Sequence, residues 1–241
     1  MSDKIGVFYG VGVGPGDPEL ITLKSYRRIQ KADVISYIAN EKGDSQAKAI
    51  AVEALSVVTK SQFHIPVVMP MSNDRSLANA AYDQAASAIA KQLRAGADVA
   101  FICEGDPLFF GSFAYLLERL KNDFCCEVIP GISSVHAAAS ALQLPLAMLK
   151  ESFAVISGRH SDQKIRDTLK QHDSVVIMKA GRARQRLLAL IAEVGRRHEA
   201  NYLSYIGREQ QSICRDVSDL ADEPGPYFSL FVITRAEREH R

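Results

Sequence analysis

The stretch GVGVGPGDPEL, residues 10–20, places four glycines between an apolar run and a segment with helical features. Nucleotide-binding proteins hold phosphates at such turns, because glycines let backbone amides approach a pyrophosphate at a helix N-terminus. The spacing argues against that use here. Counted from Gly10 or Gly12, the third glycine of a G-x-G-x-x-G motif falls on Pro15 or Asp17, and no G-K-[ST] sequence is present.

The same residues specify a tight turn from a strand into a helix. Asp17 is a suitable N-cap, Pro18 suits the first helical position, and Glu19 interacts favourably with the helix dipole. We expect the helix to continue through Leu23 and Ile29. A turn with no ligand role remains an alternative for each of the glycines.

Length and charge set limits on the class of protein. The chain of 241 residues has room for one or two modest α/β domains. Twenty-nine Lys and Arg against 28 Asp and Glu give a net charge of +1, which favours neither nucleic acid nor a membrane surface as partner. No segment approaches the ~20 apolar residues that span a bilayer. We therefore expect a soluble, cytoplasmic protein.

The cysteines predict no metal site. Cys103, Cys125, Cys126 and Cys214 include no C-x-x-C pair, and adjacent cysteines are poor metal ligands as a pair. We expect reduced, mostly buried thiols and no metal required by the protein.

The first half of the chain alternates apolar runs with helical patterns, which predicts a parallel sheet. Its apolar runs are 5–13, 33–38, 64–69, 98–103 and 127–129. Between residues 76 and 95 an apolar residue recurs at every fourth position, which predicts one buried helix face, and Arg94 with Gly96 provide a stop. The members of this face are Leu77, Ala81, Ala85, Ile89 and Leu93.

The second half is richer in strands and predicts a mixed sheet. Its apolar runs are 153–156, 174–178, 201–206 and 227–233, with a clear helix near 183–194. The boundary between the two α/β domains lies within 116–147, and we place it between residues 1–124 and 125–241.

Three glycine turns follow strands of the first half. Besides the turn at residues 14–17, Gly105-Asp106-Pro107 follows the run 98–103, and Pro130-Gly131-Ile132-Ser133-Ser134 follows the run 127–129. The carboxyl ends of parallel strands meet at one edge of a sheet, where ligands bind in open α/β folds. We expect all three turns to face one cleft.

With these turns in view, the chain resembles the S-adenosylmethionine-dependent tetrapyrrole methyltransferases of cobalamin and sirohaem synthesis over essentially its full length. The resemblance rests on GVGVGPGDPELITLK (10–24), CEGDPLFFGSF (103–113), PGISSVHAAASALQLPLA (130–147), IMKAG (177–181) and YFSLFVI (227–233). It implies methyl transfer to a ring carbon, two α/β domains with the active-site cleft between them, and a homodimer. Which carbon is methylated, and whether the substrate contains cobalt, stays open.

The resemblance also implies where the methyl donor binds. The matching positions are Pro15, Glu104, Gly105, Asp106, Phe109, Ser133, Ser134, Met178 and Gly207. Many relatives have glycine where this chain has Glu104, so the role of that side chain is open. S-adenosylmethionine carries a sulfonium and no phosphate, which explains why the first loop lacks the phosphate-binding spacing.

A run of cations after Met178 is a candidate for binding the tetrapyrrole, whose eight carboxylates suit guanidinium groups. Arg182, Arg184 and Arg186 belong to this run, and Arg208 follows the run 201–206. A solvated helix face is the alternative reading. Since successive helical residues point in different directions, we expect one of the three to contact substrate.

Other readings explain fewer of these features. His136 is a conceivable proton acceptor, but a single histidine on a helix is usually structural, and no general base is assigned. A dehydrogenase requires the failed glycine spacing and an acidic residue ~20 positions on, a place that Asp33 approaches. The hypothesis of a non-enzymatic tetrapyrrole-binding or structural protein does not explain the three glycine turns.

Overall fold

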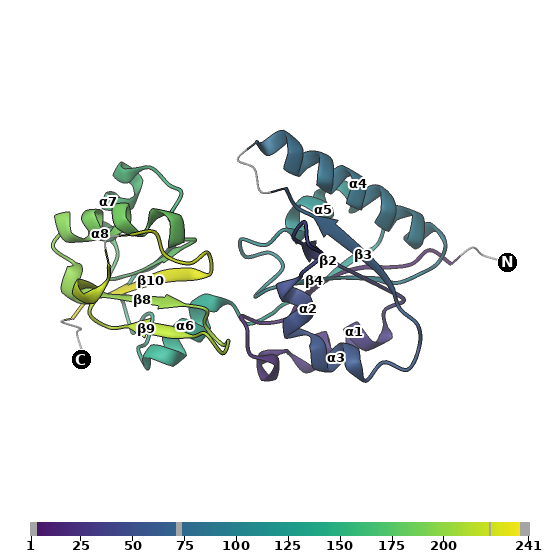
Figure 1. The fold of residues 1–241 in the computed structure, drawn as a ribbon, viewed down its shortest axis with the longest axis horizontal. Coiled ribbons are helices and arrows are strands. Elements are labelled where there is room, and N and C mark those ends of the chain that lie inside the picture. Colours follow the sequence, from purple (N-terminus) through teal and green to yellow (C-terminus); the bar gives the residue numbers. More distant parts are fainter. Residues whose placement is uncertain (1–3, 71–73, 222, 237–241) are drawn as a thin grey trace. The chain divides into compact units, whose positions relative to one another are not determined.

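The computed structural model describes residues 4–70, 74–221 and 223–236, which form two compact units, Met1–Ser134 and Val135–Arg241 (Figure 1). This division falls later in the chain than the predicted boundary at residue 124. The reason is that residues 126–129 pair with the first strand and so belong to the first sheet.

The first unit contains a five-stranded sheet in which every neighbouring pair is parallel, as predicted. The strands are β1 (Phe8–Gly12), β2 (Val34–Ala39), β3 (Phe63–Val68), β4 (Val99–Cys103) and β5 (Cys126–Ile129), in the order β3-β2-β4-β1-β5. β1 and β4 are buried along their whole length. Helices cover both faces of the sheet, which explains why these two strands read as continuous apolar runs.

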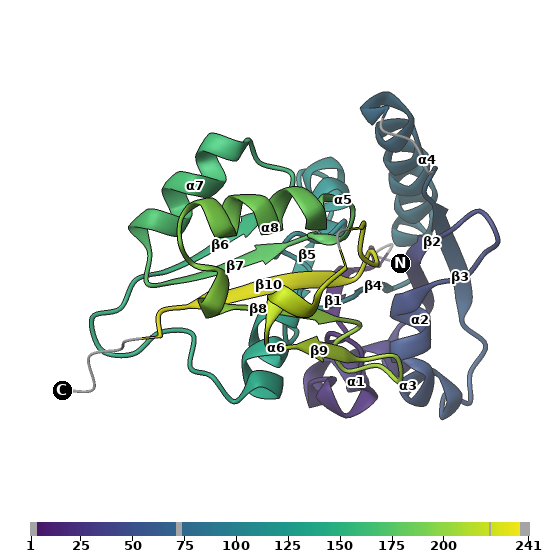
Figure 2. The same ribbon diagram turned by 60° about the vertical axis from the view of Figure 1, so that its left-hand side comes forward.

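The helices of the first unit form two layers. One layer holds α1 (Leu23–Lys31), α2 (Gln46–Ile50) and α3 (Val52–Ser56); the other holds α4 (Arg75–Arg94) and α5 (Phe113–Leu120). Figures 1 and 2 show α4 and α5 on the opposite side of the sheet from α1–α3. The core is accordingly two apolar layers separated by the sheet.

The buried face of α4 differs from the predicted one at its N-terminal end. Ile89 and Leu93 are buried as expected, but Leu77 is 48% exposed, and Tyr82 is buried in its place. An α-helix turns about 100° per residue, so a set spaced every fourth residue drifts about 40° around the helix at each step. Over sixteen residues the drift carries Leu77 off the sheet. The predicted stop is correct, since Ala95 is the C-cap and Gly96 has φ +84°.

The second unit has the predicted mixed sheet. Its strands are β6 (Phe153–Ser157), β7 (Ser174–Met178), β8 (Ala200–Ser204), β9 (Ser212–Cys214) and β10 (Ser229–Thr234), in the order β6-β7-β10-β8-β9. β6 and β7 are parallel, whereas β10 runs antiparallel to both β7 and β8, and β9 is antiparallel to β8. β7 and β8 therefore end at the same edge of the sheet, beside the start of β10.

Three helices complete the α-helical part of the second unit. They are α6 (Ser134–Leu142), which begins at the division between the units, α7 (Asp162–Gln171) and α8 (Arg184–Glu193). α8 confirms the helix predicted near 183–194, while α7 and β9 were not predicted. Short 3₁₀ turns are η1 (Pro18–Leu20), η2 (Gly181–Ala183), η3 (Arg197–Glu199) and η4 (Val217–Asp219). Within the described ranges, no helix combines the length and the apolar character needed to cross a bilayer.

Candidate functional site

The three glycine turns of the first unit lie against one another. They follow the adjacent strands β4, β1 and β5, and Gly14 and Gly105 form an antiparallel bridge in which the Gly105 amide donates to the Gly14 carbonyl at 2.7 Å. A Cβ added to Gly131 would lie 2.1 Å from the Gly105 carbonyl oxygen and 2.8 Å from the Gly12 Cα. Side chains would prevent this approach, so glycine is required for the turns to meet. We call this junction the glycine edge.

Asp106 ties two of these turns together. Its Oδ2 accepts a hydrogen bond from the Gly131 amide at 3.0 Å, and its Oδ1 accepts one from the Leu108 amide at 2.9 Å. One carboxylate oxygen therefore holds the turn after β4 against the turn after β5, and the other stabilises the turn after β4 itself. This geometry gives Asp106 a structural role at the glycine edge beside the ligand role predicted for it.

The turn after β1 is capped as predicted, but the helix that follows is interrupted. The Asp17 carboxylate accepts a hydrogen bond from the Glu19 amide at 2.9 Å and begins η1, with Pro18 at its first position. The chain then extends, and Thr22 caps the separate helix α1. Leu23 and Ile29 both belong to α1, as predicted; Leu23 is its first residue and is 71% exposed, whereas Ile29 is buried.

Seven of the nine positions predicted to bind the methyl donor lie on the turns of the glycine edge. They are Pro15, Glu104, Gly105, Asp106, Phe109, Ser133 and Ser134. Pro15 and Ser133 are buried, and the other five are half-buried. A ligand at this edge meets mostly backbone and small side chains, so a close approach of backbone to ligand is sterically feasible.

The other two positions lie at the end of β7 and just after β8 in the second unit. Met178 is the last residue of β7 and pairs with Leu230, and the Gly207 amide, with φ +76°, donates to the Gln211 Oε1 at 2.9 Å. Two residues beside them adopt left-handed backbone angles that favour glycine: Lys179 has φ +56° and Tyr205 has φ +53°. Such angles are costly for non-glycine residues and often occur at functional sites.

The predicted cation run does not form a solvated face. Arg184 is buried, and its guanidinium donates to the carbonyl oxygens of Glu223 at 2.8 Å and Ala221 at 3.2 Å. Arg186 donates to the Gly158 carbonyl and pairs with Asp162 at 2.5 Å. Both arginines therefore fasten loops of the second unit.

Arg182 and Arg208 are placed differently from those two. Arg182 is exposed in the 3₁₀ turn η2 that follows β7. The Arg208 guanidinium lies 4.0 Å from the centre of the Phe228 ring, an arrangement typical of a cation–π contact. The cation run thus leaves Arg182, among its three arginines, as the one with an exposed side chain.

Asp33, which a dehydrogenase reading would use for ribose, is engaged by its neighbours. Lys60 Nζ lies 2.8 Å from one carboxylate oxygen, and the Asp98 amide donates to the other at 3.0 Å. The hydrogen bond from Lys60 lowers the pKa of Asp33 below its ordinary value. The side chain joins β2, β4 and the loop before β3, which removes support for the dehydrogenase reading.

Two other candidate reactive groups have ordinary structural surroundings. Cys103 is buried at the end of β4, and burial raises the pKa of its thiol far above the usual range, so the thiol stays protonated and unreactive. His136 is exposed on α6. Among the described residues, no group of three or more His, Cys, Asp or Glu has a geometry that suits a metal ion.

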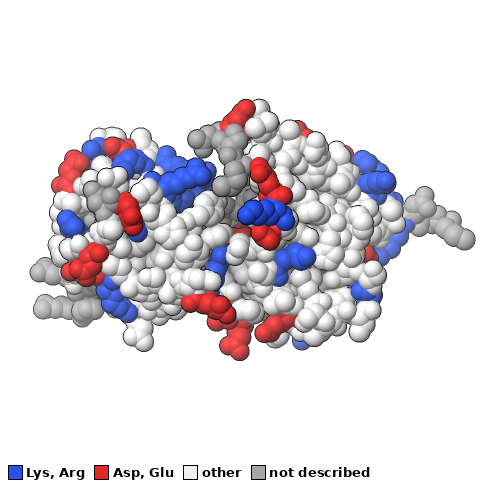
Figure 3. Space-filling view, viewed as in Figure 1, with Lys and Arg blue, Asp and Glu red and all other residues white. Residues whose placement is uncertain are grey.

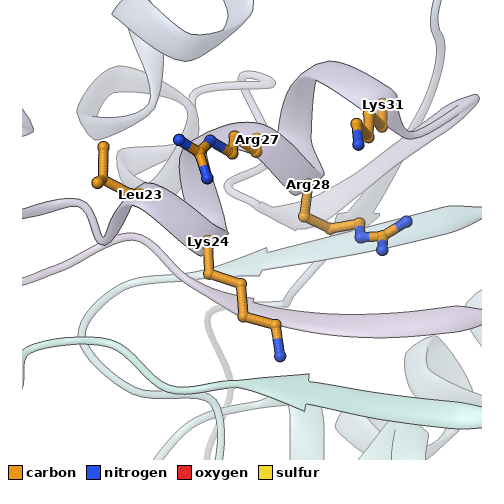
Figure 4. A pocket seen from close by; sticks show the side chains of 5 residues that line it. All are labelled: Leu23, Lys24, Arg27, Arg28 and Lys31. Carbon is orange, nitrogen blue, oxygen red and sulfur yellow. The ribbon is translucent and has the colours of Figure 1, made fainter.

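A hollow on α1 coincides with none of the predicted site residues. It is lined by Leu23, Lys24, Arg27, Arg28 and Lys31, all from the one helix (Figure 4). The four cations follow the spacing i, i+3, i+4, i+7, a helical period that the sequence interpretation did not use. The Arg28 guanidinium lies 3.7 Å from the Tyr9 ring centre, so one of the four cations packs against an aromatic ring.

The rest of the surface carries charges of both signs. Figure 3 shows acidic and basic side chains interspersed on the visible face of each unit, as a net charge of +1 suggests.

Comparison with known sequences gives one consistent result. Residues 7–221 match the family described as Tetrapyrrole (Corrin/Porphyrin) Methylases. The chain is 33% identical over 237 residues to the Precorrin-2 C(20)-methyltransferase of Sinorhizobium sp, with 95% of each chain covered. It is 32% identical over 232 residues to the Cobalt-precorrin-2 C(20)-methyltransferase of Salmonella typhimurium, with 95% of this chain and 97% of the relative covered.

Solved structures agree on the fold. A cobalt precorrin-4 methyltransferase superimposes with a TM-score of 0.73 at 19% identity, covering 95% of this chain and 94% of that one. A uroporphyrin-III C-methyl transferase from Thermus thermophilus, complexed with S-adenyl homocysteine, gives a TM-score of 0.68 at 21% identity over 95% of this chain and 98% of that one. At these identities the likeness establishes the two-domain α/β fold.

Proposed function

The chain belongs to the tetrapyrrole (corrin/porphyrin) methylases and is a methyltransferase, and we propose that it transfers a methyl group from S-adenosylmethionine to the C(20) carbon of precorrin-2 or its cobalt complex. One observation carries the choice of C(20). Two relatives that are named for this reaction are about one-third identical to the chain over nearly its whole length. Methylation of another ring carbon of a related tetrapyrrole is the alternative.

The glycine edge fits S-adenosylmethionine better than it fits a phosphate ligand. Its turns bring backbone carbonyls and amides together where a Cβ would be excluded, and Gly105 has φ +66°. A positively charged sulfonium suits carbonyl oxygens and the nearby carboxylates of Glu104 and Asp106. We propose that Pro15, Gly105 and Ser133 contact the donor mainly through backbone, with Phe109 and Ser134 beside them.

The chemistry asks little of protein side chains. When bound, S-adenosylmethionine supplies an already activated methyl group. The protein has to hold the acceptor carbon in line with that group, and positioning of two reactants contributes ~7–11 kcal/mol to lowering a barrier. The glycine edge suits this purpose, because Asp106 and the Gly14–Gly105 bridge fix its turns relative to one another. No general base is assigned for the proton that later leaves the methylated carbon.

We propose that Arg182 binds a carboxylate of the tetrapyrrole and that Arg208 contributes a second positive charge. Arg182 is favoured because the guanidinium groups of Arg184 and Arg186 already bind carbonyl oxygens and acidic side chains of their own unit. The contacts of Arg184 and Arg186 within the second unit support a structural role for both side chains. The homodimer and the cytoplasmic location remain predictions from the sequence.

The experiment combines ligand binding with product analysis. Calorimetry should detect S-adenosylhomocysteine binding and none for NADH or ATP. The purified protein, incubated anaerobically with S-adenosylmethionine and either precorrin-2 or cobalt-precorrin-2, should yield a product heavier by one methyl group, and NMR with a ¹³C-labelled methyl should place it on C(20). Binding of NADH or ATP without S-adenosylhomocysteine would overturn the proposal, and a label on another ring carbon would replace it with the alternative.

A further inference from the structure

The loop after β4 presents an apolar tip beside the glycine edge. Leu108 is 55% exposed and Phe110 is 42% exposed, with half-buried Phe109 between them. The tip follows Gly105 and Asp106 directly, so it stands within a few residues of the backbone proposed to hold the methyl donor. Two large exposed apolar side chains in three consecutive residues call for an explanation, because exposed apolar clusters often mark binding surfaces.

This apolar tip is a fixed structure. The Leu108 amide donates to the Asp106 carboxylate at 2.9 Å, and the Phe109 amide donates to the Asp106 carbonyl at 3.3 Å. The rings of Phe109 and Phe110 pack edge to face with 5.1 Å between their centres. A Cβ on Gly111 would lie 2.7 Å from the Pro107 carbonyl oxygen, so the loop folds closely back on itself. The tip is therefore preorganised, which lowers the entropy cost of binding a ligand.

The backbone of Phe110 adopts an angle that its side chain disfavours. Its φ of +56° lies in the left-handed region, which glycine adopts without steric cost and other residues rarely adopt. A bulky aromatic residue at this backbone angle costs stability, and its ring is nevertheless 42% exposed. Strained residues of this kind persist where the surrounding structure holds them and are found at binding sites.

The charge around the tip indicates which part of a tetrapyrrole it suits. Glu104 and Asp106 place two acidic groups in the same loop, and a substrate with eight carboxylates would be repelled if it turned them toward this position. The apolar ring system carries no such charge. The acidic loop with its apolar tip is therefore suited to contact the macrocycle, and the carboxylates of the substrate have to bind cationic side chains outside this loop.

We propose that Leu108 and Phe110 contact the face of the tetrapyrrole macrocycle and hold its reacting edge beside the methyl donor, an inference that rests on the proposed function. The contact determines specificity, because the tip orients the apolar ring system of the substrate. Neither residue takes part in bond making, so removing the contact weakens tetrapyrrole binding and leaves donor binding unchanged.

The test removes the ring without adding backbone strain. Phe110→Gly deletes the aromatic side chain and adopts φ +56° freely, so folding should be preserved or improved. Leu108→Ala and the double variant complete the set. The matched control is Phe63→Ala on the edge strand β3, where the phenylalanine is 58% exposed and far along the sheet order from β1 and β5.

Each variant is measured for direct binding of precorrin-2 by absorbance titration, for S-adenosylhomocysteine binding by calorimetry, and for steady-state kinetics. We expect Phe110→Gly to weaken precorrin-2 binding and raise its KM by about tenfold or more, with a larger effect in the double variant. The Kd for S-adenosylhomocysteine should stay within about twofold of wild type, and Phe63→Ala should match wild type throughout.

Three results would overturn the inference. In the first, Phe110→Gly and the double variant bind precorrin-2 as tightly as Phe63→Ala does. In the second, the variants lose only S-adenosylhomocysteine binding, and in the third only their oligomeric mass changes.

The proposed function is tested by separate outcomes of the same measurements. A wild-type protein that binds precorrin-2 through the tip but places the methyl elsewhere overturns only the C(20) proposal. Methylation at C(20) by all tip variants with wild-type KM overturns only the tip, and absence of both binding and methylation overturns both.

Discussion

The two units of the molecule use their predicted ligand-binding residues in different ways. In the first unit the predicted residues are turns whose backbones touch, and glycine is required at the contact. In the second unit most of the predicted residues are long cationic side chains, and two of them are bound by carbonyl oxygens of their own loops. A binding site made of backbone is visible in the spacing of glycines, whereas the partner of an arginine is not visible in the sequence around it.

The largest effect should come from a methyl group at the glycine edge. Gly131 does not have a positive φ, yet a Cβ there would lie 2.1 Å from the Gly105 carbonyl oxygen. We expect Gly131→Ala to lower the free energy of unfolding by about 3 kcal/mol, because backbone has to move, and to abolish S-adenosylhomocysteine binding. Urea unfolding and calorimetry measure the two quantities.

The matched control for this variant is Gly43→Ala. Gly43 has φ +87°, but a Cβ there meets nothing within 4 Å. Its cost is backbone strain alone, about 1 kcal/mol, and donor binding should be unchanged. Equal stability of Gly131→Ala and Gly43→Ala would mean that the edge has room for side chains, and the contrast between the units would disappear.

The second effect compares two arginines of one short run. Arg184→Ala removes a buried guanidinium and leaves the carbonyls of Ala221 and Glu223 without its hydrogen bonds, so we expect a loss of about 2 kcal/mol in the free energy of unfolding. Arg182→Ala removes an exposed side chain and should change stability by less than about 0.5 kcal/mol. It should instead raise the tetrapyrrole KM about tenfold while the KM for S-adenosylmethionine stays constant.

Denaturation curves and steady-state kinetics on both arginine variants measure this division of roles. If Arg182→Ala has wild-type kinetics, the second unit binds the tetrapyrrole through other groups. If Arg184→Ala is as stable as wild type, its carbonyl partners are satisfied by water, and the structural role assigned to it is wrong.

The two sheets could be predicted from the sequence wherever burial sets the pattern of residues along a strand. The strands β1, β4 and β7 are continuous apolar runs, because a strand covered on both faces needs apolar residues at every position. The short β9 at the sheet edge, only partly buried, has no such signal. The compact units divide after Ser134, inside the predicted range 116–147 and after the residue 124 chosen within it; β5 is short and half-exposed, and its place in the sheet depends on its pairing with β1.

Around the candidate site, the sequence indicates features that depend on the local backbone, and it gives no signal for contacts between residues far apart in the chain. The Asp17 carboxylate accepts from the amide of Glu19, only two residues later, and each glycine turn directly follows its strand. Both features could therefore be predicted from the sequence. The carbonyl partners of Arg184 lie 37 and 39 residues away, and Asp106 reaches Gly131 across 25 residues. The left-handed φ of Phe110 has no sequence signal, since its residue type gives no reason to expect it.

The smallest effect concerns Asp33, the residue that most favoured a nucleotide-binding reading. Its carboxylate is 48% exposed and bonds to Lys60 Nζ and the Asp98 amide. The hydrogen bond from Lys60 sets the folded pKa of Asp33 below the ordinary value of 3.8. A depressed folded pKa means that the stabilisation is fully present above pH 3.8 and is lost as the pH falls through the folded value.

Asp33→Asn should therefore lower the free energy of unfolding at pH 7 by no more than about 1 kcal/mol, because exposed ion pairs are screened by water and salt. The difference from wild type should shrink as the pH is lowered below 3.8, where the wild-type carboxyl also becomes neutral. Donor binding should be unaffected, because Asp33 directly precedes β2, and the glycine edge lies at the other end of the strands.

Urea unfolding at a series of pH values and S-adenosylhomocysteine calorimetry provide the measurements. A loss of donor binding in Asp33→Asn would return this carboxylate to a ligand-binding role, and a difference in stability that persists unchanged at low pH would show that hydrogen bonding to the neutral side chain, and not its charge, joins β2 to the loops around it.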